Sequence, residues 1–376
     1  MRPHLCHVFP AFGNGGPEVR TAIIINETAG SFRHTILSIS GDISGGHRIH
    51  AEGSVLDRVP SSSGFGAYPR ALARTLRKLR PDLLMTYGWG GVDAIVVGRL
   101  CGLARVIHGE DGFLPDEAQS QKPHRLIARR LALRRASRVI VPSRTLVEIA
   151  DRLWRLPPLK TCYVPNGVDA SRFAPATADE RAAARRRFGF QDGNIVIGTV
   201  GHIRSEKNYA RLVAAFATLR SDPRVRLIIV GDGDLRSALD RQISDLGLSE
   251  RVVFAGTVAD PVETYRAMDL FALSSDTEQM PLVVLEAMGA GLPVVSTDVG
   301  DVREMIVDAN RRYVTPLGDE EAYARALAAL AQDAQERTSL GRMNRARCLD
   351  QYDLRVMIDR YHALYSDVLH GGQKPH

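Results

Sequence analysis

The stretch Glu278-Gln-Met-Pro-Leu-Val-Val-Leu-Glu286 carries the strongest structural information in this chain, because it joins a strand to a helix. An apolar run, Leu270–Leu273, precedes it, and a helical pattern over Pro281–Gly289 follows. Proline suits the first helical position, where its missing N–H costs nothing. The predicted helix therefore begins near the end of a strand, and its free N–H groups and partial positive charge favour a phosphate. The two glutamates can accept hydrogen bonds from ligand hydroxyl groups.

The composition indicates a globular protein of two domains. The chain has 376 residues, which suits two domains of about 150–200 residues each. Hydrophobic content of 44% and charged content of 24% are typical of soluble proteins. The four cysteines lack CxxC spacing, so we expect a reducing, cytoplasmic environment and no disulfide framework or metal centre. We also expect no signal peptide and no membrane span, since apolar runs are short.

Charge is unevenly distributed along the chain. Residues 1–168 hold 23 Lys and Arg against 13 Asp and Glu, whereas the remainder holds 26 against 30. The basic half is expected to favour an anionic partner such as a lipid phosphate, a membrane surface or a nucleic acid.

Short apolar runs alternate with amphipathic segments along the whole chain. This alternation is typical of βαβ units and parallel sheets, and it predicts an α/β protein with two doubly wound domains. The expected strands are His4–Phe9, His34–Ile39, Leu83–Thr86, Arg105–His108, Val139–Pro142, Thr161–Val164, Ile195–Val200, Val225–Val230, Val252–Ala255, Leu270–Leu273 and Val294–Thr297.

The boundary between the two domains is predicted near Val168. Val164-Pro-Asn-Gly-Val-Asp169 has turn chemistry, and an aperiodic segment follows it to about Ala178. We therefore expect one domain over 1–168 and another over 169–352. The final segment, from Leu354 to Val368, has apolar residues at helical spacing.

Three further segments could carry chemistry. Gly15-Gly16 follows the first predicted strand and opens a helix, where glycines let the backbone approach a ligand. The pattern is not Gly-x-Gly-x-x-Gly, so a nicotinamide enzyme is not favoured. His108 ends another strand, and alone such a histidine is more often structural than catalytic. The third segment, Gly201-His-Ile-Arg-Ser-Glu-Lys207, opens the second domain.

Taken together, these motifs resemble the retaining family 4 glycosyltransferases of GT-B architecture. The resemblance rests on the two glutamates eight residues apart, the Gly291-Leu-Pro-Val-Val-Ser-Thr-Asp-Val-Gly300 run after them, and further matches in the same order along most of the chain. It implies two Rossmann-like domains that face each other across a cleft. It also implies that a C-terminal helix, about 353–376, crosses back onto the N-terminal domain.

The resemblance also implies roles for individual residues. His108, Lys207 and Glu278 would be catalytic: the histidine faces the donor sugar, the lysine neutralises the departing diphosphate and the glutamate binds the sugar hydroxyls. Glu286 would bind the ribose of a nucleoside-diphosphate-sugar. The donor-binding set implied is Gly15, Gly16, His202, Arg204, Lys207, Glu278, Met280, Pro281, Leu282 and Glu286. Glu110 or Asp111 could act on the acceptor hydroxyl.

One position departs from the family pattern. His202 stands where the family carries an arginine, and histidine at pH 7 mostly lacks the permanent bidentate charge of arginine. Either Arg204 takes that place, or the phosphates keep His202 charged, or activity is weakened.

No cofactor and no metal is expected. Asp232-Gly-Asp234 reads as a metal-binding DxD motif, but it lies between a strand and a helix, where these residues suit a turn and a helix N-cap.

The basic segment Lys122–Arg138 interleaves arginines with leucines and an isoleucine. It is either an ordinary helix with a solvated outer face or an interfacial helix that holds the protein on anionic lipid. The second reading places the protein on the inner face of the plasma membrane. No aromatic interleaving supports nucleic-acid binding.

The resulting hypothesis is a metal-independent, retaining hexosyltransferase. It would transfer a sugar to a hydroxyl of a glycan or lipid-linked acceptor in bacterial polysaccharide biosynthesis. Two alternatives remain: a nucleotide-sugar 2-epimerase of the same fold, and a non-catalytic nucleotide-sugar-binding protein.

Overall fold

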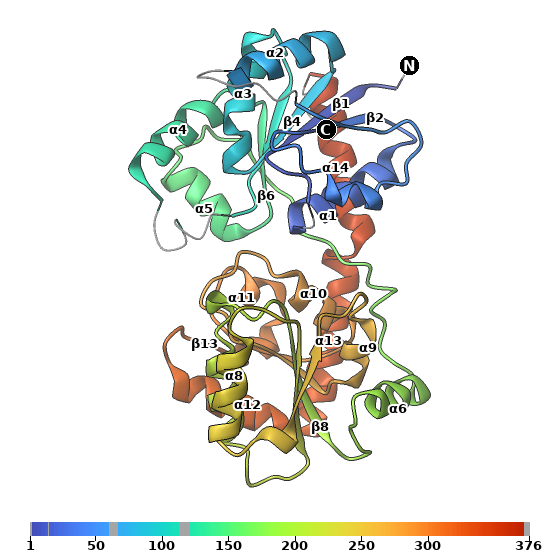
Figure 1. Cartoon of the computed structure of the whole chain (residues 1–376), viewed down its shortest axis with the longest axis vertical. Coiled ribbons are helices and arrows are strands. Elements are labelled where there is room, and N and C mark those ends of the chain that lie inside the picture. Colours follow the sequence, from blue (N-terminus) through green and yellow to red (C-terminus); the bar gives the residue numbers. More distant parts are fainter. Residues whose placement is uncertain (1, 14, 60–66, 113–116, 118–120, 372–376) are drawn as a thin grey trace. The chain divides into compact units, whose positions relative to one another are not determined.

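The chain folds into two compact units, each an open parallel sheet with helices around it (Figure 1). The computed structural model describes residues 2–13, 15–59, 67–112, 117 and 121–371. The N-terminal unit comprises residues 1–166 and 357–376, and the C-terminal unit comprises residues 167–356.

The N-terminal unit contains a seven-stranded sheet in the order β3-β2-β1-β4-β5-β6-β7, with every pairing parallel. This order places a topological switch point between β1 and β4, since the chain winds outward from them in both directions. The strands are β1 (His4–Phe9), β2 (Arg33–Ser38), β3 (Val55–Arg58), β4 (Leu83–Tyr87), β5 (Val106–Gly109), β6 (Arg138–Val141) and β7 (Thr161–Tyr163). The helices are α1 (Gly16–Thr28), α2 (Ala67–Leu79), α3 (Val92–Leu100), α4 (Pro123–Leu133) and α5 (Arg144–Arg152).

The two faces of this sheet differ in polarity. Cys6 and Val8 of β1 belong to an apolar cluster on one face. His7, whose side chain alternates to the opposite face, donates or accepts hydrogen bonds with Tyr87 of β4 (2.8 Å) and His34 of β2 (3.0 Å). His34 in turn contacts the Thr28 hydroxyl at 3.1 Å. A buried row of hydrogen-bonded polar side chains therefore lies on one face of the sheet.

The C-terminal helix returns to the N-terminal unit. Helix α14 spans Leu354–Leu369, and its residues from Met357 onward belong to that unit. Tyr365 packs its ring edge-on against Phe32, and Asp367 forms an ion pair with Arg138 at 3.2 Å. The predicted crossing of this helix is confirmed. The last residues of the expected helix, 372–376, lie outside the described part.

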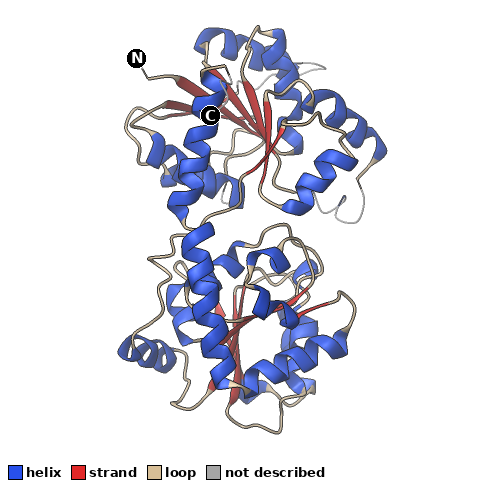
Figure 2. Cartoon of the chain, turned by 180° about the vertical axis from the view of Figure 1, so that it is seen from behind, coloured by secondary structure: helices blue, strands red, loops and turns tan. Residues whose placement is uncertain are grey.

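The C-terminal unit contains a six-stranded sheet in the order β10-β9-β8-β11-β12-β13, again parallel throughout. Figure 2 shows its strands between helices. The strands are β8 (Ile195–Val200), β9 (Val225–Val230), β10 (Val252–Gly256), β11 (Leu270–Leu273), β12 (Val294–Thr297) and β13 (Val314–Thr315). The helices are α6 (Ala178–Arg187), α7 (Tyr209–Ala217), α8 (Arg236–Asp245), α9 (Val262–Ala267), α10 (Leu282–Gly289), α11 (Val302–Met305), α12 (Glu320–Gln332) and α13 (Ala334–Gln351).

Two apolar clusters cover the two faces of the second sheet. Alternate residues of β8 divide between them: Val196 joins one cluster and Ile197 the other. Strands buried on both faces require continuous apolar runs, which explains why these segments stand out in the sequence.

The α/β class and the two doubly wound sheets agree with the prediction, but some details differ. β3 and β13 were not expected. β3 is mostly exposed and β13 has only two residues, so neither carries a clear apolar pattern. Pro281 lies at the N-cap of α10 in an extended conformation, not at the first helical position.

Candidate active site

The loops that follow β8 and β11 meet at the switch point of the C-terminal sheet. β8 and β11 are hydrogen-bonded neighbours, and from them the chain winds to opposite edges. The loop after β8 carries Lys207, and the loop after β11 carries Glu278. In open α/β sheets, ligands bind beyond the carboxyl ends of the strands at such a point.

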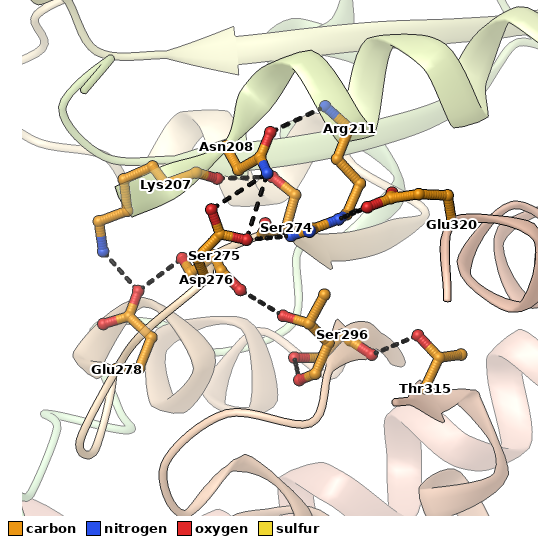
Figure 3. Close-up of polar contacts among 11 residues, drawn as sticks. Lys207, Asn208, Arg211, Ser274, Ser275, Asp276, Glu278, Ser296, Thr315 and Glu320 are labelled. Carbon is orange, nitrogen blue, oxygen red and sulfur yellow. Dashed lines mark hydrogen bonds and ion pairs between the residues drawn. The ribbon is translucent and has the colours of Figure 1, made fainter. Parts of the chain in front are cut away.

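Lys207 and Glu278 are in direct contact, although 71 positions separate them in the sequence. The Lys207 Nζ atom donates to Oε1 of Glu278 at 2.6 Å (Figure 3). The Ser275 hydroxyl donates to the same oxygen at 2.7 Å. The two side chains keep 15% and 12% of their surface exposed, so solvent reaches the pair. A lysine that solvent reaches in such a pair can bind an anionic ligand in place of the glutamate.

Glu286 belongs to a separate hydrogen-bond network on α10. The Tyr265 hydroxyl donates to Oε2 of Glu286 at 2.7 Å and lies 3.3 Å from the Val283 carbonyl. Burial raises the pKa of the Glu286 carboxyl, and the hydrogen bond from Tyr265 partly opposes that effect. Tyr265 therefore fixes the orientation of a carboxyl group that has lost much of its hydration. The sequence offered no sign of this tyrosine, which lies 21 residues earlier in the chain.

The segment 278–282 is held in place by the burial of Met280 and by a close contact with Gly300. Met280 is 5% exposed and packs into the core, so its side chain cannot face a ligand. Pro281, the N-cap residue of α10, makes no side-chain hydrogen bond to the first turn. Gly300 adopts a positive φ of 52°, and a Cβ atom there would lie 2.3 Å from the Gln279 carbonyl. A glycine is thus required for the close approach that lets the Asp301 N–H donate to Gln279 at 2.8 Å.

His202 and Arg204 lie on the exposed side of the loop after β8. Arg204 forms an ion pair with Glu206 at 2.6 Å, and its side chain is 57% exposed. His202 and Arg204 both lie in the loop that the sequence predicts to bind the donor.

The Asp232-Gly233-Asp234 turn packs against that loop. Ile203 donates its N–H to the Asp232 carbonyl at 2.9 Å, and Asp232 Oδ1 accepts from the Gly233 N–H at 2.8 Å. The interpretation of these residues as a helix N-cap is wrong, because Leu235 occupies the N-cap of α8 without a side-chain bond. Among the described residues, no group of three or more His, Cys, Asp or Glu side chains could hold a metal ion.

In the N-terminal unit, the Gly15-Gly16 turn opens α1. Gly15 is the N-cap residue, and a Cβ atom there would lie 2.4 Å from Oε2 of Glu18. A Cβ atom at Gly16 would meet nothing within 4 Å. Of the two glycines, Gly15 is therefore the one at which a larger side chain would meet the Glu18 carboxylate.

The other predicted residues of this unit are engaged with their own neighbours. His108 is fully buried, bonds Thr86 Oγ1 through Nδ1 at 2.8 Å, and places Nε2 3.8 Å from Glu110. Glu110 lies 3.5 Å from the buried Arg129 guanidinium. Arg20 holds Asp111 through two hydrogen bonds of 2.5 and 2.8 Å. Asp111 is thus held by Arg20, whereas the buried Oε2 atom of Glu110 has no hydrogen-bond partner among the described residues.

No helix of the described residues is both long and apolar enough to cross a bilayer.

Two family profiles match the chain. One, described as glycosyl transferases group 1, matches residues 180–347. The other, described as a glycosyl transferase 4-like domain, matches residues 15–167. The first profile covers all strands of the C-terminal sheet, and the second covers those of the N-terminal sheet except β1.

Relatives with described activities align with most or half of the chain. A UDP-Gal:alpha-D-GlcNAc-diphosphoundecaprenol alpha-1,3-galactosyltransferase of Escherichia coli is 25% identical over 80% of this chain and 79% of its own length. A 2-deoxystreptamine N-acetyl-D-glucosaminyltransferase of Streptomyces fradiae is 31% identical over 70% and 66%. A D-inositol 3-phosphate glycosyltransferase of Stackebrandtia nassauensis is 34% identical over 51% and 46%. With this last relative, the match spans about half of each protein.

Solved structures share the fold over nearly the whole chain. HepE of Anabaena, crystallised with UDP, superposes with a TM-score of 0.84 at 22% identity and covers 98% of this chain and 100% of its own. Sucrose-phosphate synthase of Thermosynechococcus elongatus gives a TM-score of 0.80 at 20% identity over 98% and 100%. With two parallel Rossmann-like sheets, both family profiles and these relatives in agreement, the chain belongs to the family 4 glycosyltransferases of GT-B architecture.

Proposed function

We propose that this protein transfers a sugar from a nucleoside-diphosphate-sugar to a hydroxyl group of a glycan or lipid-linked acceptor, with retention of the anomeric configuration. The observation that carries the proposal is the Lys207–Glu278 contact at the switch point of the C-terminal sheet. The names of the relatives support it, because the Escherichia coli protein acts on a lipid-linked sugar and HepE was crystallised with UDP. We also propose a role in bacterial polysaccharide biosynthesis, as the resemblance of the sequence motifs implies.

The chemistry asks mainly for stabilisation of a leaving group. The bond between the anomeric carbon and the diphosphate breaks, a bond to the acceptor oxygen forms, and the acceptor proton passes to the departing phosphate. Lys207 would turn from Glu278 toward the diphosphate, and the freed carboxylate would hold the sugar hydroxyls. Glu286 would bind the ribose, with its orientation held by Tyr265. Placed charges of this kind stabilise the transition state without a protein nucleophile.

The donor can be identified by thermal-shift measurements with UDP-, GDP- and ADP-sugars. The sugar-nucleotide that stabilises the protein is then incubated with and without an acceptor, and the anomeric configuration of the product is read by NMR. Transfer with retention supports the proposal. Isomerised donor in the absence of acceptor would favour the 2-epimerase, and binding without turnover would favour a nucleotide-sugar sensor.

We further propose that the reaction needs no metal ion, since Lys207 and the N-terminus of α10 can offset the diphosphate charge. Activity should persist in EDTA. A strong loss that Mg²⁺ or Mn²⁺ restores would instead assign a metal to Asp232 and Asp234.

A second proposal concerns a surface of the N-terminal unit that binds anionic lipid on the inner face of the plasma membrane. Ile127 and Leu131 of α4 are 56% and 57% exposed, and Leu159 is 86% exposed. Arg134 Nη2 donates to the Arg155 carbonyl at 3.1 Å, which brings the segment before β7 beside α4. Exposed apolar side chains among arginines suit a lipid interface better than bulk water.

Vesicle sedimentation tests this surface. Ile127→Ser with Leu131→Ser, or glutamine in place of the exposed arginines, should lower binding to phosphatidylglycerol vesicles. The exposed Leu317→Ser, in the C-terminal unit, serves as the matched control. If all variants bind the vesicles equally, this surface does not bind lipid and the proposal is wrong.

A further inference from the structure

A group of three polar side chains joins the loop that carries Lys207 to the loop that carries Glu278. We call this group the loop clasp; it consists of Asn208, Arg211 and Asp276, and Glu320 of α12 contacts Arg211 from outside the two loops (Figure 3). Arg211 is its centre: Nη1 donates to the Ser274 carbonyl and to Asp276 Oδ1, both at 2.7 Å. Nε donates to both carboxylate oxygens of Glu320, at 2.9 and 2.8 Å.

Asn208 completes the clasp directly beside Lys207. Its Nδ2 donates to both carboxylate oxygens of Asp276, at 3.2 and 3.1 Å, and its Oδ1 caps α7 by accepting from the Arg211 N–H. Asn208 also has a φ of 42°, a left-handed conformation that asparagine adopts more readily than most other residues with a side chain. The conformation persists because the side chain is held on two sides.

The backbones of the two loops are bonded to each other at the same place. The Asp276 N–H donates to the Glu206 carbonyl at 2.8 Å, and the Ser274 hydroxyl donates to the Lys207 carbonyl at 2.8 Å. The main chain of Lys207 is therefore attached to the strand end from which Glu278 follows. Since the lysine side chain is long and flexible, the position of its main chain decides which atoms its Nζ can reach.

We infer that Arg211 is a positioning residue, which acts through Asp276 and the Ser274 carbonyl to set the place of Lys207 relative to Glu278. The guanidinium suits this task, because Arg211 is only 9% exposed and its Nη1 and Nε donors bind acceptors on three residues at once. This inference deepens the proposed function and rests on it for its catalytic consequence. A shift of about 1 Å in such a group can cost about 10²-fold in rate.

The first measurement needs no ligand. Lysine side chains are labelled by reductive ¹³C-methylation, and the Lys207 signal is assigned by its loss in Lys207→Arg. Arg211→Met and Asp276→Ala should both move this signal toward that of a solvated lysine, because the contact with Glu278 loosens. Asn208→Gly, which tolerates the left-handed backbone but removes the side-chain bonds, should move it part of the way.

Two controls separate positioning from a general structural effect. Glu320→Ala removes the partner on the far side of the guanidinium and should leave the Lys207 signal in place. Arg251→Met removes another arginine of the same unit, which donates to the carbonyls of Arg220, Asp222 and Val225 and contacts neither of the two loops through these bonds. It should likewise leave the signal unchanged.

Titration with UDP supplies the second measurement. We expect Arg211→Met and Asp276→Ala to weaken UDP binding about tenfold or more, and the two controls to bind as the unaltered protein does. If the unaltered protein does not bind UDP, the proposed function fails for uracil donors, while the lysine signals still decide the role of Arg211.

The inference is overturned if folded Arg211→Met and Asp276→Ala keep the original Lys207 signal, or if Glu320→Ala or Arg251→Met moves it equally. If Arg211→Met does not fold, Asp276→Ala and Asn208→Gly decide the question alone.

Discussion

Each unit holds one prominent pair between a basic side chain and a glutamate, and the two pairs differ in burial. In the N-terminal unit, Arg129 contacts Glu117 at 3.1 Å, and both side chains are completely buried. In the C-terminal unit, Lys207 contacts Glu278 at 2.6 Å at an edge that solvent reaches. A buried ion left without its partner destabilises a protein strongly, whereas a solvated ion can take another partner. We therefore expect the first pair to support stability and the second to support binding.

The largest expected effect comes from Lys207→Ala. Removal of a charge that stabilises the leaving group should lower kcat/KM about 10³-fold. The free energy of unfolding should fall by less than the roughly 3 kcal/mol expected for a fully buried pair, because solvent and the Ser275 hydroxyl still reach the Glu278 carboxylate. Steady-state kinetics and urea denaturation provide the two measurements. Glu286→Ala should behave similarly, and near-normal turnover in either variant would remove the proposed site.

Arg129→Met should have the opposite effect, with a larger loss of stability than Lys207→Ala causes. The substitution removes the Arg129 guanidinium from the buried Glu110 and leaves Glu117 with Arg125 as its basic partner, which should lower the free energy of unfolding by about 3 kcal/mol. Arg325→Met, which breaks an exposed pair with Glu321 at 3.2 Å, is the control and should change stability by at most about 0.5 kcal/mol. Equal stability of the two variants would contradict the comparison.

Buried histidines of the N-terminal unit give its stability a pH dependence. Burial and the neighbouring charges of His4 and Arg2 lower the pKa of His34 from 6.5 to about 4. The unfolded chain therefore takes up a proton below pH 6.5 that the folded state refuses until about pH 4. Stability should fall as pH drops through this window, by up to about 3 kcal/mol.

His34→Gln keeps a polar side chain but cannot titrate, so its stability should depend less steeply on pH between 6.5 and 4. The exposed His50→Gln should retain the original slope. Identical slopes in all three proteins, measured by urea denaturation at each pH, would assign the acid sensitivity to other groups.

The smallest expected effect concerns Tyr265. Tyr265→Phe keeps the ring but removes the hydrogen bond to Glu286, so KM for the donor should rise about fivefold while kcat stays nearly constant. Tyr323→Phe is the matched control, because Tyr323 is fully buried and its hydroxyl has no hydrogen-bond partner among the described residues. A larger change in the control would mean that loss of a buried hydroxyl alone explains the effect.

The sequence predicted most of the fold because the relevant signals are local. Strands buried on both faces need unbroken apolar runs, and helices need a 3.6-residue period, so β8 and β9 were found at their observed bounds. The strand, loop and helix around Glu278 and Glu286 were visible for the same reason. The membership of the chain in its family follows from the order of these motifs.

Only the tertiary structure decided which side chains meet. Lys207 reaches Glu278 across 71 positions, and Arg211 reaches Glu320 across 109, because parallel strands bring distant loops to one edge of a sheet. The same holds for Arg129, which the sequence presented as one arginine of a basic helix and which the fold buries against Glu117. Local patterns determine where elements begin and end, whereas burial and the pairing of charges depend on contacts between elements far apart in the chain.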